Sequence, residues 1–442
     1  MEKNIRRSDI GDTVMKIHGF WGPYDAYKSE KWDLPDLKTD EIYRLTKEAG
    51  FNVISQSNDD YPEKADNVKK ALDFCQKHNM FYLVASSKLK RFKAYHTKDN
   101  ELFMASEEEI CQTLGEVLSH PACFGMEIQD EPLPVAVPEV GEFVRRYKNA
   151  LKTLGLTDRS YYLNLLPVSG FVSNPPTIED WQEYVQSAID HCGRDFVDYD
   201  FYPFQKPESG SKDNISPGLY NHLEALYEVV DKNGGDIPMG FAPPVGGNWT
   251  EEEDNPANRA PSPEELEWEI GVALAFGITR FEYFTLCNPH SFLKYMPHGQ
   301  TGVFNPDGSK GKLYDAVKRS NEQIIAVDEY LLKSKNKQVM FLKDYPSEIE
   351  YRYKDHINDK NSSYKELVSV DGDGAIIGCF DYKGKTALYV VNTFKKAQTL
   401  TLNFDIERKV KLVNRMDGVV DKTAKAVSLN LGKAEATLVI VE

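Results

Sequence analysis

Cysteine is scarce in this sequence, and its spacing indicates neither a metal site nor a disulfide framework. Only six of the 442 residues are cysteines, and no two of them have the short paired spacing of a zinc knuckle. Long apolar runs are lacking as well, because no segment approaches the roughly 20 apolar residues that span a membrane. We therefore expect reduced thiols, no bound metal and a soluble protein.

Basic residues are in deficit. The chain has 53 lysines and arginines against 69 aspartates and glutamates, which gives a formal net charge of −16. This charge argues against nucleic acid and anionic membranes as partners, and it suits small neutral substrates. No apolar segment follows the charged N-terminus, so no signal peptide is predicted. The expected location is the cytoplasm, or outside the cell if a leader has been removed, and the sequence indicates no oligomeric state.

An alternation of strand-like and helix-like runs extends over residues 1–335. Each of eight strand-like runs is followed by a helix-like run, and the predicted strands are 14–21, 51–57, 80–86, 123–132, 160–166, 196–204, 237–241 and 278–286. Eight such units are the number in a (β/α)8 TIM barrel, an α/β fold. An open, doubly wound sheet is the alternative, but no glycine-rich phosphate loop follows the first strand. The barrel is the favoured prediction.

From residue 336 the pattern changes to short strands separated by turns. The predicted strands are 338–342, 366–370, 375–382, 385–392, 399–404, 409–413, 427–431 and 436–441. This pattern predicts an antiparallel β-sandwich. We therefore expect a catalytic barrel over residues 1–335 and a β-sandwich domain over residues 336–442, and we assign the second domain no sugar site.

The fourth predicted strand ends in a pair of carboxylates followed by a proline, Asp130-Glu131-Pro132. Side chains alternate between the faces of a strand, so Glu127, Gln129 and Glu131 are predicted to share one face. Carboxylates inside a barrel are costly unless they are paired or change their pKa values. A salt-bridged strand end explains the pattern as well as an active site does. The position favours the catalytic interpretation, because active sites of such barrels lie at the C-terminal ends of the strands.

Other predicted strands bring polar and aromatic side chains to the same end of the barrel. Each has an ordinary structural explanation: His18 would serve as a hydrogen-bonded wall residue, and Arg280 would pair with Glu282. Together they predict a pocket for a neutral, hydroxyl-rich ligand such as a sugar, because aromatic rings stack on C–H surfaces while carboxylates and amides bind hydroxyls. The predicted substrate-binding residues are His18, Trp21, Asn58, Asp130, Asn164, Tyr202 and Tyr283.

Hydrolysis of a glycosidic bond needs two carboxyl groups, one to protonate the leaving oxygen and one to act as nucleophile or base. Glu131 is the predicted acid, because partial burial and the neighbouring Asp130 would raise its pKa. Glu282, Asp200 and Asp198 are the candidates for the second carboxylate. No metal or cofactor is expected, since the sequence contains no His-x-His motif or compact set of ligands.

The Asp-Glu-Pro motif at 130–132 resembles the end of the fourth strand in the TIM-barrel glycoside hydrolases of the clan that includes β-galactosidases, β-glucosidases and endoglycanases. Segments 20–21, 199–203, 277–285 and 307–321 are also similar to that clan. The resemblance implies a barrel hydrolase with a C-terminal β-domain and with Glu131 as the acid/base. The clan places its nucleophilic glutamate at the end of the seventh strand, whereas residues 237–244 contain no acid.

This departure leaves four explanations open. The seventh strand is shifted relative to the acids at 251–253, or the nucleophile has moved to Glu282 or Asp200, or the mechanism inverts, or catalysis has been lost. We predict a glycoside hydrolase acting on an oligo- or polysaccharide, and the alternative is a barrel that binds carbohydrate without cleaving it. A metal-dependent barrel hydrolase or isomerase is a third hypothesis, weakened by the missing ligand motif.

Overall fold

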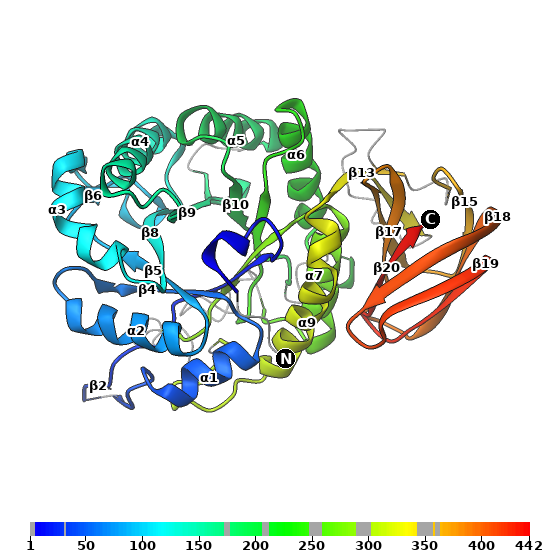
Figure 1. The fold of residues 1–442 in the computed structure, drawn as a ribbon, viewed down its shortest axis with the longest axis horizontal. Coiled ribbons are helices and arrows are strands. Elements are labelled where there is room, and N and C mark those ends of the chain that lie inside the picture. The colour runs from blue at the N-terminus through cyan, green and yellow to red at the C-terminus, as the bar shows by residue number, and fades with distance from the viewer. Residues whose placement is uncertain are drawn as a thin grey trace.

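The computed structural model describes residues 5–30, 32–171, 177–205, 212–246, 259–288, 302–342, 357–358 and 363–442. Eight parallel strands form a closed barrel (Figure 1) in the order β1, β12, β11, β10, β9, β8, β5 and β4. The predicted TIM barrel is therefore confirmed, and β11 is its seventh strand in chain order. The barrel strands are β1 (Lys16–Phe20), β4 (Val53–Asp60), β5 (Phe81–Ala85), β8 (Cys123–Asp130), β9 (Ser160–Leu165), β10 (Val197–Asp200), β11 (Met239–Ala242) and β12 (Arg280–Phe284).

Helices surround the barrel, and several begin at residues suited to capping. The side chains of Thr39, Ser106, Thr177 and Ser262 each accept a hydrogen bond from a backbone N–H in the first turn. Gly155 ends one helix with a left-handed φ of 69°. In the described parts of the chain, no helix has the length and apolar character needed to cross a membrane. The helices are α1 (Asp40–Glu48), α2 (Ala65–Lys77), α3 (Glu107–Leu118), α4 (Val137–Leu154), α5 (Ile178–Cys192), α6 (Gly218–Lys232), α7 (Pro263–Ala275) and α9 (Tyr314–Leu331).

The barrel loops contain short elements. Two small antiparallel hairpins pair β2 with β3 and β6 with β7. The second hairpin follows β5 and therefore lies on the side of the barrel where the strands end. The short elements are β2 (Tyr27–Lys28), β3 (Asp33–Leu34), β6 (Lys90–Arg91), β7 (Phe103–Met104) and the 3-10 turns η1 (Arg7–Asp9), η2 (Tyr95–Thr97), η3 (Pro134–Ala136), η4 (Val168–Gly170) and η6 (Lys212–Asn214).

An all-β domain follows the barrel, as predicted. Its strands form one curled sheet in the order β14, β13, β16, β17, β20, β18 and β15, with β19 paired to β18; all pairs are antiparallel except β13 with β14. The strands are β13 (Ser334–Leu342), β14 (Ile357–Asn358), β15 (Leu367–Asp371), β16 (Ala375–Tyr382), β17 (Lys385–Val391), β18 (Gln398–Asn414), β19 (Gly418–Leu431) and β20 (Ala436–Val441).

One strand assignment in this domain was wrong. The predicted strands 399–404 and 409–413 form a single strand, β18, whose pairing with β19 shifts register between Asn403 and Arg408. Residues 405–408, which separate the two predicted strands, are Asp-Ile-Glu-Arg. Their charged side chains interrupt the apolar alternation that would have indicated one continuous strand. β19 is likewise longer than the predicted strand 427–431.

One apolar face of the sheet packs against the barrel, and the other faces the interior of the β-domain. Along β16, Ile376 and Phe380 pack with the barrel core, whereas Ile377 and Cys379 pack inside the β-domain, as period-two alternation requires. Figure 1 shows the β-domain beside α7 and α9. Nearly every residue of α7 after its first turn is buried, because this helix packs between the barrel and the β-domain. The division at 335/336 stays a prediction.

Candidate active site

Strand β8 places Glu127 and Asp130 beside polar side chains of its neighbours. The hydroxyl of Tyr162 donates to Oδ1 of Asp130 at 2.7 Å, and Nδ2 of Asn164 donates to the same oxygen at 3.3 Å. The pairing of β8 with β9 shifts register between Glu127 and Gln129. This shift breaks the predicted alternation and brings Asp130 into the polar cluster. Burial raises the pKa of Asp130 to about 6 and that of Glu127 to about 7.

Glu131 follows β8 directly and has a left-handed backbone, with a φ of 49°. This conformation is uncommon for residues other than glycine, and such residues cluster at functional sites. The N–H of Glu131 donates to the carbonyl of Asn164 at 2.9 Å, and its own carbonyl accepts from the N–H of Tyr95 at 3.0 Å. Burial raises the pKa of Glu131 to about 10, and the charges of Asp200 and Asp130 add to this effect. Glu131 therefore keeps its proton at neutral pH.

Asp200 ends β10 and lies beside the same amide group. Nδ2 of Asn164 donates to Oδ1 of Asp200 at 3.0 Å while it also reaches Asp130, so one nitrogen joins carboxyl groups from two strands. Burial raises the pKa of Asp200 to about 8, and the charge of Asp130 adds to it. The structure thus brings together four of the residues that the sequence singled out: Asp130, Glu131, Asn164 and Asp200.

A buried group of charges lies next to this cluster in the barrel interior. Arg280 donates two hydrogen bonds to Asp198, of 2.7 and 2.9 Å, and Nζ of Lys16 lies 3.3 Å from Asp198 and 3.6 Å from Glu282. Nδ1 of His18 lies 3.3 Å from Glu282. Burial alone would raise the pKa of Asp198, but Arg280 and Lys16 hold it below its ordinary range. Arg280 therefore pairs with Asp198, and Lys16 lies between Asp198 and Glu282.

Aromatic side chains gather beside Phe284 at the end of β12. Tyr202 stacks on Phe284 with ring centroids 5.7 Å apart and planes 19° apart, and Trp21 approaches the same ring at 5.1 Å. Trp21 follows β1 directly and, like Glu131, has a left-handed backbone, with a φ of 51°. Both Trp21 and Tyr202 are partly exposed. These two predicted residues therefore form an aromatic surface at the strand ends that carry the carboxyl groups.

Two predicted substrate-binding residues lie outside this arrangement. The hydroxyl of Tyr283 donates to Oδ1 of Asn321 on α9 at 2.7 Å, and its side chain is fully buried between the barrel wall and the helices. Asn58 is exposed near the end of β4, and its carbonyl accepts a hydrogen bond from Lys64. The position of Tyr283 corrects its assignment to the pocket, because an outward residue of β12 faces a helix.

Sequence reasoning missed Lys16, Tyr162 and Lys90. Lys16 lies two residues before His18 on β1, and Tyr162 lies two residues before Asn164 on β9, so period-two spacing from the recognised residues would have found both. Lys90 lies on the hairpin strand β6 after β5, and the nearby charges of Glu127, Asp60 and Asp130 act on it. Because Lys90 lies in a connection between barrel elements, the period-two spacing of the barrel strands does not indicate it.

The seventh strand supplies no carboxylate. A Cβ atom on Gly240 would lie 2.0 Å from Oδ1 of Asp198, so the glycine leaves the space that this buried carboxylate occupies. Ala242, at the end of β11, is in register with Asp200. The acids at 251–253 lie outside the described residues. The strand assignment of β11 is correct, so its lack of an acid is a departure from the clan pattern.

The arrangement is suited to proton transfer. Among the residues that the structure describes, no group of three or more histidine, cysteine, aspartate or glutamate side chains is placed to hold a metal ion. Glu131 carries a proton at neutral pH, while Asp130, with a pKa of about 6, is largely ionised. Neighbouring carboxyl groups whose pKa values are driven apart are a recurring basis for acid and base roles.

No family model matches the sequence, and no curated protein matches it. Among solved structures, a β-galactosidase from Bacillus circulans sp. alkalophilus is 11% identical, with a TM-score of 0.52 over 98% of this chain and 100% of that one. The chain has the fold of that enzyme. At this identity the likeness concerns the fold alone.

Two further solved structures are similar to a lower degree. A glycoside hydrolase family 5 protein from Bacteroides vulgatus is 10% identical over 97% of this chain and 88% of that one, with a TM-score of 0.49. A β-galactosidase from Marinomonas ef1 is 12% identical with a TM-score of 0.44; the match covers 71% of this chain and spans 60% of the length of that enzyme.

Proposed function

We propose that the protein is a glycoside hydrolase that cleaves an O-glycosidic bond of an oligo- or polysaccharide, with Glu131 as the general acid. The observation that carries this proposal is the placement of Glu131, directly after a barrel strand and beside two other carboxyl groups, where burial raises its pKa. A general acid must hold its proton until the leaving oxygen takes it. Burial and the charges of Asp200 and Asp130 keep the proton on Glu131.

Asp200 is the second carboxylate in this proposal. It ends β10, and its charge is the largest charge effect on Glu131, which supports close spacing. Glu282 is the weaker candidate because Nζ of Lys16 lies 3.6 Å from its carboxylate, inside the barrel. In the reaction, Glu131 would protonate the glycosidic oxygen as its bond to carbon breaks, and ionised Asp200 would attack the carbon or activate water.

The neighbouring side chains suit a carbohydrate. Trp21 and Tyr202 offer aromatic surface to the C–H face of a sugar ring, and Asn164 and Asp130 offer polar atoms to its hydroxyl groups. His18 is fully buried and is hydrogen-bonded to Ser55, so it supports the wall of the barrel. The proposed substrate is neutral, in keeping with a site already rich in carboxyl groups.

A barrel that binds carbohydrate without cleaving it is the second candidate. The specific observation in its favour is strand β11, where Gly240 and Ala242 stand in place of an acid. In this case the same aromatic and polar residues would hold the sugar, and the raised pKa of Glu131 would be a consequence of burial without a catalytic use.

Turnover of a panel of nitrophenyl glycosides and natural oligosaccharides by the wild type and by Glu131→Gln separates the two candidates. Loss of a general acid costs about 10²–10⁴-fold in rate on the natural oligosaccharides, whose leaving oxygen needs the proton. Glu183→Gln, on the exposed face of α5, is the matched control and should leave turnover unchanged. If no glycoside is cleaved while a glycan raises the Tm of the wild type, the binding candidate replaces the hydrolase.

A further inference from the structure

One connection of the barrel passes the ends of three neighbouring strands. Residues 86–95 follow β5, which lies between β4 and β8 in the barrel. Early in this connection, the N–H of Ser87 donates to Oδ1 of Asp60, the last residue of β4, at 2.6 Å. At its end, the N–H of Tyr95 donates to the carbonyl of Glu131, which directly follows β8, at 3.0 Å. The connection therefore lies along the rim of the barrel, next to the proposed acid.

Packing fixes the middle of this connection. Leu89 and Phe92 are both buried, and the ring of Phe92 lies 5.9 Å from that of Phe143 on α4. The N–H of Ala105 donates to the carbonyl of Leu89 at 2.9 Å and so joins the two sides of the β6–β7 hairpin. Lys90 lies between the two buried residues, so its backbone has a fixed position at the rim.

The ammonium group of Lys90 has no partner in the part of the chain that the structure describes. Its side chain is partly buried, but no carboxylate there forms an ion pair with Nζ and no acceptor lies at hydrogen-bond distance from it. Burial lowers the pKa of Lys90, and the charges of Glu127, Asp60 and Asp130 oppose this effect. These three carboxylates therefore lie near the ammonium group without pairing with it.

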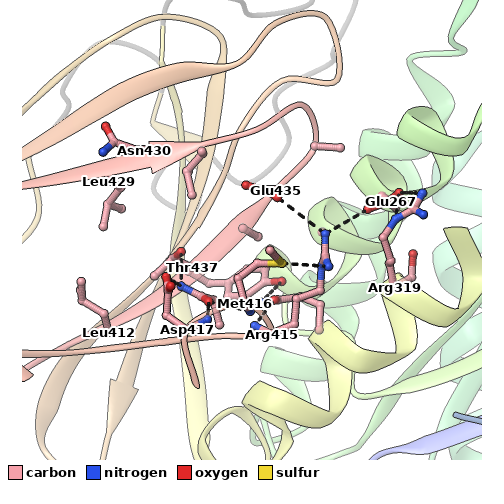
Figure 2. A pocket seen from close by; sticks show the side chains of 18 of the residues that line it. Glu267, Arg319, Leu412, Arg415, Met416, Asp417, Leu429, Asn430, Glu435 and Thr437 are labelled. Atoms are coloured by element: carbon pink, nitrogen blue, oxygen red, sulfur yellow. Dashed lines mark hydrogen bonds and ion pairs between the residues drawn. The ribbon is translucent and has the colours of Figure 1, made fainter. Parts of the chain in front are cut away.

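Two other shielded cations of the protein have acidic partners. Figure 2 shows Arg415 between Glu267 on α7 and Glu435 next to β20, at distances of 3.9 and 3.6 Å. Lys16 likewise has two carboxylate partners inside the barrel. A charge withdrawn from water is costly unless it is paired. Lys90 thus has donors for a group that the described residues do not supply.

The acids around Lys90 determine the chemistry of that group. Asp130 is largely ionised at neutral pH, because its pKa is about 6, so an anionic ligand would be repelled. A hydroxyl group accepts a hydrogen bond through its oxygen and donates its own hydrogen, so it fits between an ammonium group and a carboxylate. A sugar offers such hydroxyl groups on successive carbons.

We propose that Lys90 is a substrate-binding residue, whose ammonium group donates a hydrogen bond to one hydroxyl group of the sugar that lies beside Asp130. The proposal rests on the barrel site of the proposed function, but it needs the sugar to bind there and not to be cleaved. Lys90 would help to select the sugar, because a sugar that lacks this hydroxyl group leaves the ammonium group without a partner.

Turnover of sugars that lack single hydroxyl groups tests the proposal. The nitrophenyl glycoside that the wild type cleaves best is compared with its monodeoxy analogues and with nitrophenyl glucuronide. Lys90→Met should lose about 10–100-fold in kcat/KM on the parent glycoside. On the one analogue that lacks the partner hydroxyl group, the wild type and Lys90→Met should be equal, because neither makes the hydrogen bond.

Lys88→Met is the matched control. Lys88 is an exposed lysine of the same connection, so its substitution removes the same charge and should leave kcat/KM unchanged. Methionine keeps most of the length of the lysine side chain, and Lys90 has no ion-pair partner to lose among the described residues. The Tm of sugar-free Lys90→Met should therefore not fall below that of the wild type.

A loss on the parent glycoside that disappears on one monodeoxy analogue supports the proposal. An equal loss on every analogue overturns it, because Lys90 would then act on the carboxyl groups and not on a hydroxyl group. A loss confined to the glucuronide also overturns it, since the ammonium group would then bind a carboxylate. The absence of any loss overturns it as well.

Binding distinguishes a failure of this proposal from a failure of the proposed hydrolysis. If the wild type cleaves no glycoside, the hydrolase proposal fails, and the same proteins are compared by isothermal titration calorimetry with D-glucose, D-galactose, D-xylose and their monodeoxy analogues. A sugar that Lys90→Met binds about 10–100-fold more weakly, with the difference lost on one analogue, supports the role of Lys90. A wild type that binds none of these sugars overturns it.

Discussion

The carboxylate of Asp198 occupies the space beside Gly240 that a side chain would need. A Cβ atom on Gly240 would lie 2.0 Å from Oδ1 of Asp198, which is far inside van der Waals contact. Asp198 has no room to move, because Arg280 and Lys16 hold it in a buried ion pair. Position 240 of the seventh barrel strand, β11, therefore has no space for a side chain, because the carboxylate of Asp198 on the sixth strand, β10, fills it.

Gly240→Ala is expected to destabilise the protein by about 1–3 kcal/mol, because overpacking displaces the ion pair. The measurement is the free energy of unfolding in urea. Gly115→Ala, on α3, is the control: its new Cβ would lie 3.3 Å from a leucine methyl group, and alanine favours helices. Equal stability of the two variants would contradict the steric explanation.

Asp198→Asn is expected to cost about 3–5 kcal/mol in stability, because it leaves buried cationic side chains without their partner. The pKa of Asp198 is lowered in the folded state, so its contribution is present above the unfolded value of about 3.9 and is lost as the pH falls below it. The difference between wild type and variant should therefore shrink in acid. Glu41→Gln, in an exposed pair with Arg44, is the control and should show no such difference.

Glu269, on α7, is fully buried, and neither of its carboxyl oxygens has a hydrogen-bond partner in the described part of the chain. Burial raises its pKa well above the ordinary value. The folded state thus retains a proton that the unfolded state releases above about pH 4.3, so stability falls as the pH rises from there toward the folded pKa.

Glu269→Gln should remove this loss. The variant is expected to match the wild type near pH 4 and to exceed it by about 1 kcal/mol or more at pH 8, as measured by urea unfolding at both values. Glu264→Gln, on the first turn of the same helix, should follow the wild type at both values. A wild type that is as stable as Glu269→Gln at pH 8 would show that Glu269 ionises inside the fold without cost.

The pH dependence of turnover follows from the two proposed carboxyl groups. Asp200 must be ionised, and its pKa is about 8; Glu131 must be protonated, and its pKa is about 10. The kcat/KM profile should rise as the pH increases toward 8 and fall above 10, with an optimum between these values. An optimum below pH 6 would contradict the assignment of Asp200. Asp200→Asn should abolish the reaction, whereas Asp66→Asn, exposed on α2, should leave the profile unchanged.

Much of the barrel was predictable from the sequence, because strand and helix periods alternate clearly up to residue 335. Period-two spacing also placed Asp198 and Asp200 correctly inside the barrel. The register shift in β8 was not predictable, since residues 127–129, where it occurs, include no glycine or proline. The ion-pair partner of Arg280 was not predictable from the sequence either. Arg280 pairs with Asp198, 82 residues away in the chain, although Glu282 is its nearest acid in sequence.

The central claim is that Glu131 protonates the leaving oxygen, and the dependence on leaving group tests it most directly. Nitrophenolate departs with little need of a proton, whereas the sugar oxygen of a natural disaccharide requires one. For any sugar that the wild type cleaves, Glu131→Gln should lose about 10²–10⁴-fold in kcat/KM on the disaccharide and much less on the nitrophenyl glycoside. An equal loss on both substrates, or no loss on either, would contradict the role of Glu131 as general acid.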